Sequence, residues 1–360
     1  MRILHIIPKL SGGGAERQLS YLTPELARMG HEVHIAYTKD WPLKPELPDV
    51  VLHRLKSRSS YDPYLLWQLL RLTRQLKPDI IHTWILQSDV LGAIVGKLNK
   101  IPWILREPGS AMDYPQSWKN RLRILAASSA SAIVSNSLGG DDYWKTQLPD
   151  SRRYCVPNGL PIEEINKTIP ALPTGLATKA VPIVLYVGRL ASDSGGSKNL
   201  KAFMEALKLI NGKRKVFGVI CGDGPQRSEL EKLRHTLRLD SDVAFTGYLQ
   251  ATSVWALMKK ASVFMSLSAY EGCPNTVMEA MMCSCPMVLS DIPAHREILA
   301  DSDALFVDPC NNQQTCDSVI QTLDDRETAK NRAFLAKQKA QKWSVSRMAR
   351  NYEKVYKEMV

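Results

Sequence analysis

The sequence has 360 residues, of which 44% are hydrophobic and 23% charged, as in an ordinary globular protein. A chain of this length predicts two domains, and none of its apolar runs is long enough for a membrane-spanning helix. The first apolar run, residues 2–7, is too short for a signal peptide and predicts a buried strand. The seven cysteines lack paired metal-ligand spacing, which favours reduced thiols in a cytosolic protein over a disulfide framework.

The net charge of +11 is unevenly distributed along the chain. Residues 50–125 contain twelve Lys or Arg against five Asp or Glu. A basic face of this kind can meet nucleic acid, an anionic membrane surface or a phosphorylated acceptor. No nucleic-acid motif accompanies it, so we expect no nucleic-acid partner. Contact with a membrane or a pyrophosphate, and a merely solvated basic face, both remain open.

Short apolar runs alternate with helical patterns through the first half of the chain. This alternation predicts an α/β fold with a parallel, doubly wound sheet. The predicted strands are residues 2–7, 32–37, 50–55, 79–84, 102–107 and 132–137. Ligands of such sheets bind beyond the carboxyl ends of the strands. The candidate cleft residues are therefore His82, Arg106, Glu107, Asn136 and Ser137, although His82 could equally be a satisfied histidine at a strand end.

The turn after the first strand, Ser11-Gly12-Gly13-Gly14-Ala15-Glu16, is rich in glycine. It lacks the third glycine of a dinucleotide fingerprint because Arg17 stands there, which argues against a nicotinamide-dependent oxidoreductase. The glycines could also serve only a tight turn.

The second half repeats the alternation after a linker at residues 166–180. The strand at residues 183–189 ends in Gly188-Arg189, and Lys198 opens the next helix. Arg189 and Lys198 thus stand at the two ends of one loop, where two cations can clamp a diphosphate. Further strands lead into the turn at Asp223, which could be ordinary turn chemistry, and into Gly247.

The most informative stretch runs from Glu271 to Glu279 and reads as strand, tight loop and helix start. A helix start suits an anionic phosphate, Gly272 allows close approach and Pro274 suits the beginning of a helix. Two carboxylates beside such a turn can accept hydroxyl protons, which describes a site for a nucleotide sugar. A capped surface helix with two solvated glutamates is the simpler alternative.

These motifs, in this order, resemble those of the retaining glycosyltransferases of family 4 (glycosyl transferases group 1). The resemblance implies the GT-B fold, in which two Rossmann-like, doubly wound domains face each other across a cleft. Residues 1–168 would bind the acceptor and residues 178–343 the nucleotide sugar. The C-terminal helix, about residues 344–360, would pack back on the first domain.

The resemblance also implies roles for individual residues. Glu271 would contact the sugar hydroxyls, Glu279 the ribose hydroxyls, and Gly247 would border the nucleobase. The implied catalytic residues are Arg189, Lys198 and Glu271. The implied donor-binding residues are Gly188, Arg189, Lys198, Asp223, Gly247, Glu271, Gly272, Cys273, Pro274, Asn275, Thr276 and Glu279.

On the acceptor side, the resemblance implies that Gly13 and Gly14 leave room for the substrates and that Glu16 anchors the turn or meets the acceptor. Many members of the family have a histidine at the second strand tip, where this chain has Arg106-Glu107-Pro108. Arg106 could hold an acceptor phosphate there, and Glu107 could take an acceptor hydroxyl proton.

The implied reaction moves a sugar from a nucleoside diphosphate, such as a UDP-sugar, to an acceptor hydroxyl with retention. No protein nucleophile, metal or other cofactor is expected, because the basic side chains and helix starts would stabilise the leaving diphosphate. The pairs Asp240/Asp242 and Asp301/Asp303 precede strands and are interpreted as loop residues.

The basic first half favours a lipid-linked, polyprenyl-phosphate type or otherwise anionic acceptor in polysaccharide or glycan assembly. We expect a cytoplasmic protein in peripheral contact with the inner face of the plasma membrane. The alternatives are a soluble small-molecule acceptor or a non-catalytic nucleotide-sugar-binding protein, although the latter would be expected to have lost one of the motif residues.

Overall fold

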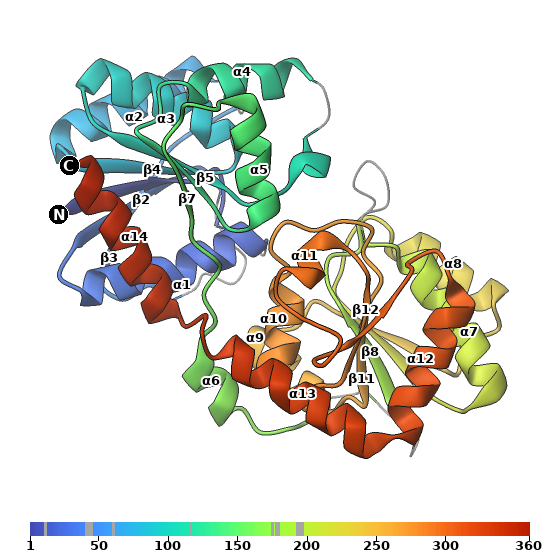
Figure 1. The fold of residues 1–360 in the computed structure, drawn as a ribbon. Helices are drawn as coiled ribbons and strands as arrows, with labels where there is room; N and C mark the ends of the chain where they lie inside the picture. The colour runs from blue at the N-terminus through green and yellow to red at the C-terminus, as the bar shows by residue number, and fades with distance from the viewer. Residues whose placement is uncertain are drawn as a thin grey trace. The chain divides into compact units, whose positions relative to one another are not determined.

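The computed structural model describes residues 1–10, 13–39, 46–59, 62–114, 117–173, 176, 181–191 and 198–360. The chain forms two compact units (Figure 1), one of residues 1–159 and 343–360 and one of residues 160–342. Helix α6 (Ile162–Lys167) contacts α9 (Ala251–Lys260) and α10 (Asn275–Met282) of the second unit. Residues 160–168, which the sequence assigned to the first domain, therefore belong to the second unit.

The first unit contains a seven-stranded sheet in the order β3-β2-β1-β4-β5-β6-β7. Every neighbouring pair of strands is parallel, as the alternating pattern predicted. Strand order reverses between β1 and β4, where His5 lies opposite His82. The strands are β1 (Arg2–Ile6), β2 (Glu32–Tyr37), β3 (Val50–Arg54), β4 (Ile80–Trp84), β5 (Trp103–Glu107), β6 (Ala132–Ser135) and β7 (Arg153–Cys155).

Helices cover both faces of the first sheet because its buried strands alternate their side chains between two apolar cores. Ile3 faces α1 (Gly14–Arg28) and α14 (Val345–Met359). Leu4 faces the core that α2 (Pro63–Leu76), α3 (Leu86–Asn99), α4 (Trp118–Ala127) and α5 (Leu138–Gln147) complete. Figure 1 shows these two layers of helices. Side-chain N-caps begin several of them, at Asp62, Ser117, Ser137 and Ser344.

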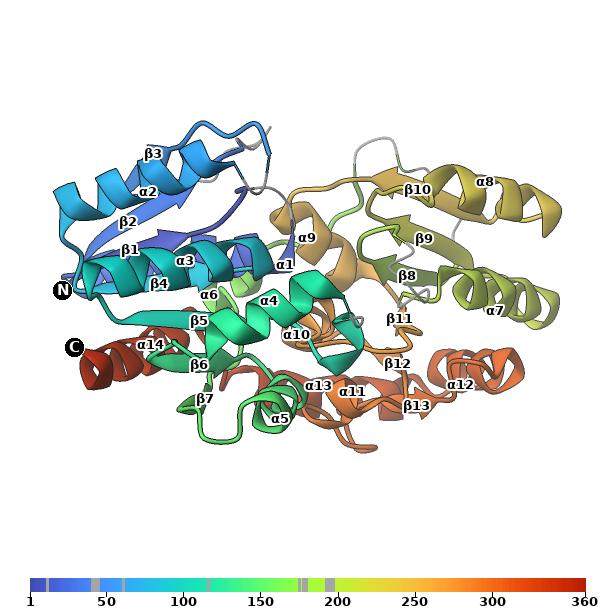
Figure 2. The same ribbon diagram turned by 90° about the horizontal axis from the view of Figure 1, so that it is seen from above.

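The second unit contains a six-stranded parallel sheet in the order β10-β9-β8-β11-β12-β13, whose strands lie side by side in Figure 2. The strands are β8 (Ile183–Val187), β9 (Phe217–Cys221), β10 (Val243–Gly247), β11 (Val263–Ser266), β12 (Met287–Ser290) and β13 (Leu305–Val307). The remaining helices are α7 (Leu200–Lys213), α8 (Arg227–Thr236), α11 (Pro293–Arg296), α12 (Asn312–Asp324) and α13 (Arg326–Ala340). Two Rossmann-like units confirm the predicted fold class.

Two further predictions concern the state of the cysteines and the absence of membrane-spanning helices. All seven cysteines are free, and burial raises the pKa of the Cys221 thiol to about 11, so this thiol is neutral at pH 7. Among the described residues, no helix combines the length and the apolar character needed to cross a bilayer.

Polar side chains in the interior of the first unit connect β4 and β5 to α14. Arg106 Nη2 donates to Asn158 Oδ1 at 2.5 Å and Arg106 Nε to the Tyr352 hydroxyl at 3.1 Å. His82 Nδ1 and the Tyr356 hydroxyl form a hydrogen bond of 2.7 Å. The C-terminal helix is thus held by directional bonds as well as by apolar contacts, and these bonds fix its rotation against the sheet.

The loops at the carboxyl edge of the second sheet are interlocked through their backbones. Gly188 N donates to Cys221 O at 3.0 Å, Gly222 N to Gly247 O at 2.9 Å and Leu190 N to Asp223 O at 3.0 Å. Gly222 has a φ of +139°, and a Cβ atom there would lie 1.9 Å from Gly188 O. Glycine is therefore required at position 222 for two reasons, its backbone conformation and the close approach of the neighbouring loop.

We predict that Asn158→Ala destabilises the first unit. The substitution leaves one nitrogen of a buried guanidinium without its partner, which costs about 1.5–3 kcal/mol. Urea denaturation followed by tryptophan fluorescence measures the change, with exposed Gln75→Ala as the control, for which we expect less than about 0.5 kcal/mol. Equal effects of the two substitutions would show that the Arg106–Asn158 bond contributes nothing.

We predict that Gly222→Ala and Gly212→Ala have opposite effects on the free energy of unfolding. Alanine at position 222 is strained by about 1–3 kcal/mol from its backbone alone and also meets Gly188 O. A Cβ at Gly212, in α7, meets nothing within 4 Å, so alanine there should stabilise the helix by about 0.5–1 kcal/mol. Urea denaturation followed by circular dichroism compares the two, and a neutral Gly222→Ala would contradict the interlocked arrangement.

Candidate functional site

An ion pair joins two of the predicted catalytic residues at the carboxyl edge of the second sheet. Lys198 Nζ, just before α7, donates to Glu271 Oε1, in the loop after β11, at 2.6 Å. The Ser268 hydroxyl donates to the same carboxylate oxygen at 2.8 Å. Both partners stay accessible, with 26% of the Lys198 side chain and 16% of the Glu271 side chain exposed. The sequence predicted that Arg189 and Lys198 together clamp a diphosphate. The structure adds the pairing of Lys198 with Glu271, and Arg189 is exposed after β8.

A buried histidine that the sequence did not single out lies beneath this pair. His295 Nδ1 forms a hydrogen bond of 2.8 Å with Ser290 O, and the Ser290 hydroxyl donates to Ser268 O at 2.6 Å. Burial lowers the pKa of His295, while the Glu271 charge opposes and the Lys198 charge reinforces this change. His295 therefore stays neutral at pH 7 and supports the Glu271 loop. No spacing in the sequence links it to that loop, since the contact arises only when β11 and β12 pair.

The two glutamates of the Glu271–Glu279 stretch differ in burial. Glu271 precedes the turn Gly272-Cys273-Pro274, and α10 begins at Asn275 with Thr276 next. These turn residues are half-buried, except Pro274, which is buried. Glu279, one turn into the helix, is only 2% exposed, and its charge contributes to the raised pKa of Cys221 at the end of β9. Helix α10 thus extends from the loop that carries Glu271 towards the end of β9.

The other predicted donor residues lie on the neighbouring loops of the same edge. Gly188, Asp223 and Gly247 end or follow β8, β9 and β10. Asp223 is exposed, and its carboxylate accepts the Gly224 N–H at 2.7 Å, which is turn chemistry. Every residue of the predicted donor set therefore lies at or next to one edge of the second sheet.

In the first unit, Gly13 is the N-cap of α1 and Glu16 lies in its first turn. A Cβ atom at Gly13 would lie 2.2 Å from Glu16 Oε2, and Glu16 is buried. The carboxylate thus folds back on the turn, as in a capping box, which favours the anchoring role over a direct acceptor contact. Gly14 is exposed at the first position of the helix, and Ser11 and Gly12 lie outside the described residues.

His82 is fully buried against α14, and burial, followed by the charges of His5 and Arg106, places its pKa well below the ordinary value. This burial favours the structural role that the sequence kept as an alternative, with Nδ1 bonded to Tyr356 and Nε2 without a hydrogen-bond partner among the described residues. Arg106 is also buried, and its guanidinium lies 4.4 Å from the centroid of the Trp84 ring. Its partners are therefore protein groups, which argues against the predicted contact with an acceptor phosphate.

Glu107 is likewise buried and hydrogen-bonded within the protein. It accepts from Arg123 Nη1 at 2.9 Å, Trp144 Nε1 at 2.8 Å and the Tyr114 hydroxyl at 2.5 Å. Arg123, which the sequence did not single out, also bonds buried Asp89 at 2.7 Å. A buried carboxylate with these partners is poorly placed to take a proton from an acceptor hydroxyl. Its position therefore argues against the predicted role of Glu107 in taking that proton.

Asn136, at the end of β6, is buried as well. Its Nδ2 donates to Pro108 O at 3.2 Å, and its backbone N–H donates to Glu107 O at 3.2 Å. Ser137 caps α5 by accepting from Gly140 N. The predicted acceptor residues on β4, β5 and β6 are therefore mainly internal, in contrast to the accessible pair of the second unit.

Comparison with known families matches both halves of the chain. Residues 12–164 match the model described as Glycosyltransferase Family 4, and residues 174–341 match the model of glycosyl transferases group 1. The chain is 26% identical over 366 residues to the N-acetylgalactosamine-N,N'-diacetylbacillosaminyl-diphospho-undecaprenol 4-alpha-N-acetylgalactosaminyltransferase of Campylobacter jejuni, covering 96% of each protein. It is 26% identical over 317 residues to the 2-deoxystreptamine N-acetyl-D-glucosaminyltransferase of Streptomyces fradiae, covering 76% of this chain and 74% of that protein.

Among solved structures, Anabaena HepE in complex with UDP-glucose superposes with a TM-score of 0.82 at 18% identity, covering 99% of this chain and 100% of that one. This similarity shows a shared fold. The family matches to both units and the fold agree, and the chain belongs to the group 1 glycosyltransferases of the GT-B fold.

Proposed function

We propose that this glycosyltransferase moves a sugar from a nucleoside diphosphate to an acceptor hydroxyl with retention of anomeric configuration. The observation that carries the proposal is the accessible Lys198–Glu271 pair, placed where α10 begins. Lys198 and Arg189 would bind the diphosphate, Glu271 would accept from sugar hydroxyls and Glu279 from the ribose. The bound UDP-glucose named for HepE supports a nucleotide-sugar donor.

In this proposal the protein supplies position and charge. The acceptor hydroxyl attacks the anomeric carbon from the side of the departing phosphate, the bond to the phosphate oxygen breaks, and that oxygen takes the hydroxyl proton. Retention then follows without a protein nucleophile. Fixed cations at the leaving group stabilise its developing charge, so we propose that neither a metal nor another cofactor is needed.

The outer surface of α2, α3 and α4 supports an acceptor at an anionic membrane. Tyr64 and Trp67 are 50% and 51% exposed and stack at 5.5 Å, and the Arg71 guanidinium lies 5.6 Å from the Trp67 ring. Trp118 on α4 is 62% exposed, with Lys119 Nζ 5.9 Å from its ring. Exposed aromatics beside cations are typical of the membrane interface.

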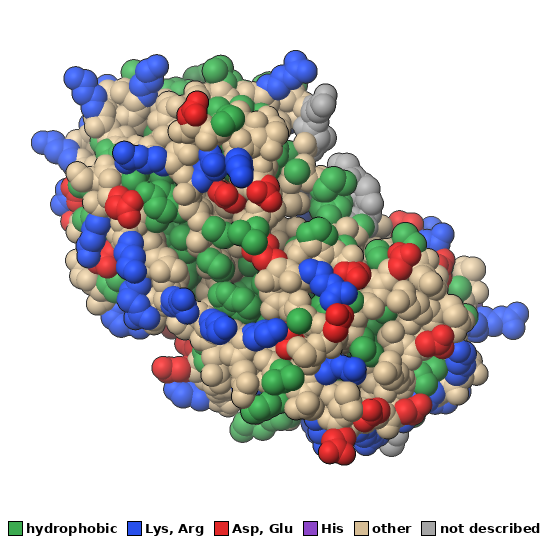
Figure 3. Space-filling model, viewed as in Figure 1, with side chains coloured by type: hydrophobic (Ala, Val, Ile, Leu, Met, Phe, Trp, Pro, Cys, Tyr) green, Lys and Arg blue, Asp and Glu red, His purple; other side chains and the backbone are tan. Residues whose placement is uncertain are grey.

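The charges on these helices also support contact with an anionic membrane. Asp89, which is buried, is the single acidic residue within α2, α3 and α4. Figure 3 shows Lys and Arg side chains projecting from the edge of the first unit where these helices lie. Helices that carry no exposed acidic side chain of their own suit anionic lipids. We therefore propose peripheral membrane contact and a lipid-linked acceptor, consistent with the diphospho-undecaprenol in the name of the Campylobacter relative.

A soluble acceptor is the second candidate. The name of the Streptomyces relative includes 2-deoxystreptamine, a small molecule. The same donor chemistry would then act on a soluble hydroxyl, and the exposed aromatic residues would have no part in the reaction.

We predict that Lys198→Ala lowers turnover about 10²–10³-fold, the loss seen when one stabilising donor at a developing anion is removed. Saturation-transfer NMR with UDP, GDP and ADP first identifies the nucleotide, and release of the nucleoside diphosphate then gives the rate. Lys201→Ala is the matched control, because Lys201 lies three residues further along, in the first turn of α7, with 75% of its side chain exposed.

The same assay tests the stereochemistry and the need for metal. Retention predicts that the anomeric NMR signal of the product has the configuration of the donor, and metal independence predicts an unchanged rate in EDTA. An inverted product, a rate abolished by EDTA or an unaffected Lys198→Ala would each contradict the corresponding part of the proposal.

We predict that the double substitution Tyr64→Ser and Trp67→Ser weakens binding to anionic vesicles at least about tenfold, because two interfacial aromatics are lost. Cosedimentation with phosphatidylglycerol vesicles measures this. Phe334→Ser is the control, since Phe334 is 55% exposed on the second unit. Absence of vesicle binding by the wild type, or equal loss in the control, would favour the soluble acceptor.

A further inference from the structure

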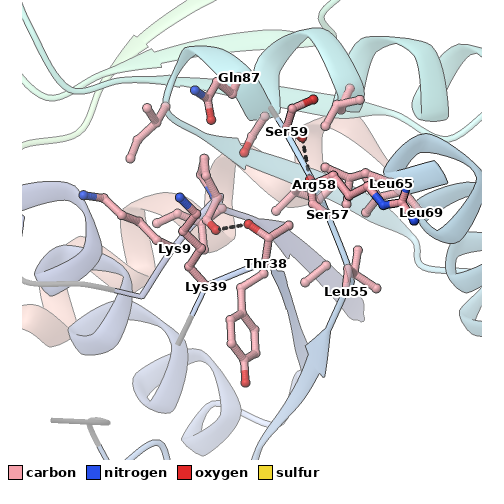
Figure 4. Close-up of a pocket in the computed structure, with 18 residues that line it drawn as sticks. Lys9, Thr38, Lys39, Leu55, Ser57, Arg58, Ser59, Leu65, Leu69 and Gln87 are labelled. Atoms are coloured by element: carbon pink, nitrogen blue, oxygen red, sulfur yellow. Dashed lines mark hydrogen bonds between the residues drawn. The ribbon is translucent and has the colours of Figure 1, made fainter. Parts of the chain in front are cut away.

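A cavity of about 390 Å³ lies within the first unit, apart from the predicted cleft residues. It is bordered by the ends of β1 and β2, by the segment after β3, and by α2 and α3 (Figure 4). Cavities of this size commonly hold small ligands or parts of larger ones.

The cavity is amphipathic. Its inner wall is apolar and consists mainly of Ile6, Ile7, Leu55, Leu65, Leu69 and Leu91. Its polar edge carries three exposed cations, Lys9, Lys39 and Arg58, and no Asp or Glu is among the described residues that line it. In Figure 4, Lys9 and Lys39 lie on one side and Arg58 on the other.

Two of these cations are held side by side by the backbone. Lys9 and Lys39 face each other in a parallel bridge, and Lys39 N donates to Pro8 O at 3.2 Å. Like charges directly opposite each other repel, and neither lysine has an ion pair within the described ranges of the chain. An anion between them would relieve the repulsion.

Two hydroxyl groups of the cavity wall are already bonded within the protein. Thr38 Oγ1 donates to Pro8 O at 2.5 Å and the Ser57 hydroxyl to Ser59 O at 2.5 Å. Ser59, Ser88 and Gln87 also line the cavity, beside its three cations and its apolar wall. The combination fits a ligand with an anionic head and a hydrocarbon part.

We propose that this cavity binds the phosphate and the first hydrocarbon segment of an amphipathic acceptor, such as a polyprenyl phosphate ester. This inference rests on the proposed transfer to a lipid-linked acceptor. Helix α2 joins the two surfaces, because Leu65 and Leu69 line the cavity while Tyr64, Trp67 and Arg71 lie on the proposed membrane face. In this proposal a lipid phosphate that leaves the bilayer at α2 enters the cavity beside the same helix.

Isothermal titration calorimetry of the full chain with geranyl diphosphate, pyrophosphate and geraniol tests the proposal. Geranyl diphosphate should bind at least about tenfold more tightly than either of the other two, since it alone uses both the cations and the apolar wall. Lys39→Gln with Arg58→Gln should weaken geranyl diphosphate binding at least about tenfold. Lys97→Gln with Lys100→Gln, which removes two cations at the C-terminal end of α3 and outside the cavity, should leave it unchanged.

Leu91→Ser separates the two possible sources of the phosphate. It should weaken binding of geranyl diphosphate but not of pyrophosphate, because Leu91 belongs to the apolar wall. Equal binding of the two probes, with no effect of Leu91→Ser, would overturn the lipid assignment and indicate a site for soluble phosphates. Binding unaffected by the Lys39→Gln and Arg58→Gln pair would overturn the site itself.

Nucleotide binding, measured on the same samples, keeps this inference distinct from the proposed function. If the nucleotide binds and geranyl diphosphate does not, the cavity assignment fails while the donor proposal stands. If neither binds, the proposed function fails and the cavity assignment with it.

Discussion

A charge buried in a protein needs partners, because removing it from water costs several kcal/mol. Strand β5 ends with two such charges in succession, Arg106 and Glu107. Consecutive residues of a strand point to opposite faces of the sheet. Arg106 therefore bonds Asn158 and Tyr352 on the side of α14, and Glu107 bonds Arg123 and Trp144 on the side of α4 and α5. One dipeptide thus connects the sheet to both helical layers.

The second unit uses charge differently. Its charged pair, Lys198 and Glu271, stays partly accessible and is supported from below by the Ser268, Ser290 and His295 bonds. The surrounding loops are interlocked through their backbones, with Gly222 fitting against Gly188. Rigid loops around an accessible ion pair are suited to binding a charged ligand without reorganisation. This arrangement supports the proposed binding of the donor by the second unit.

Helix α2 of the first unit has three kinds of surface. One line of leucines completes the core, part of the same line borders the cavity, and the opposite face exposes Tyr64 and Trp67. Because 3.6 residues make one turn, a 14-residue helix can serve all three. In the proposed function, α2 therefore connects the membrane surface to the binding cavity.

The sequence by itself determined the fold class, since short apolar runs alternating with helical patterns leave few options besides parallel, doubly wound sheets. It also predicted that the proposed donor residues lie together, because strand ends of a parallel sheet share one edge. The sequence could not determine whether the side chains at those strand ends are buried or accessible. Arg106 and Glu107 follow the same strand-tip pattern as an open site, yet Asn158, Tyr352 and Arg123, distant in sequence, reach them only in the folded unit. For the same reason, only the tertiary structure decided the pairing of Lys198 with Glu271, the support from His295 and the cavity beside α2. Each depends on contacts between segments that are far apart in the sequence, and no local pattern predicts such contacts.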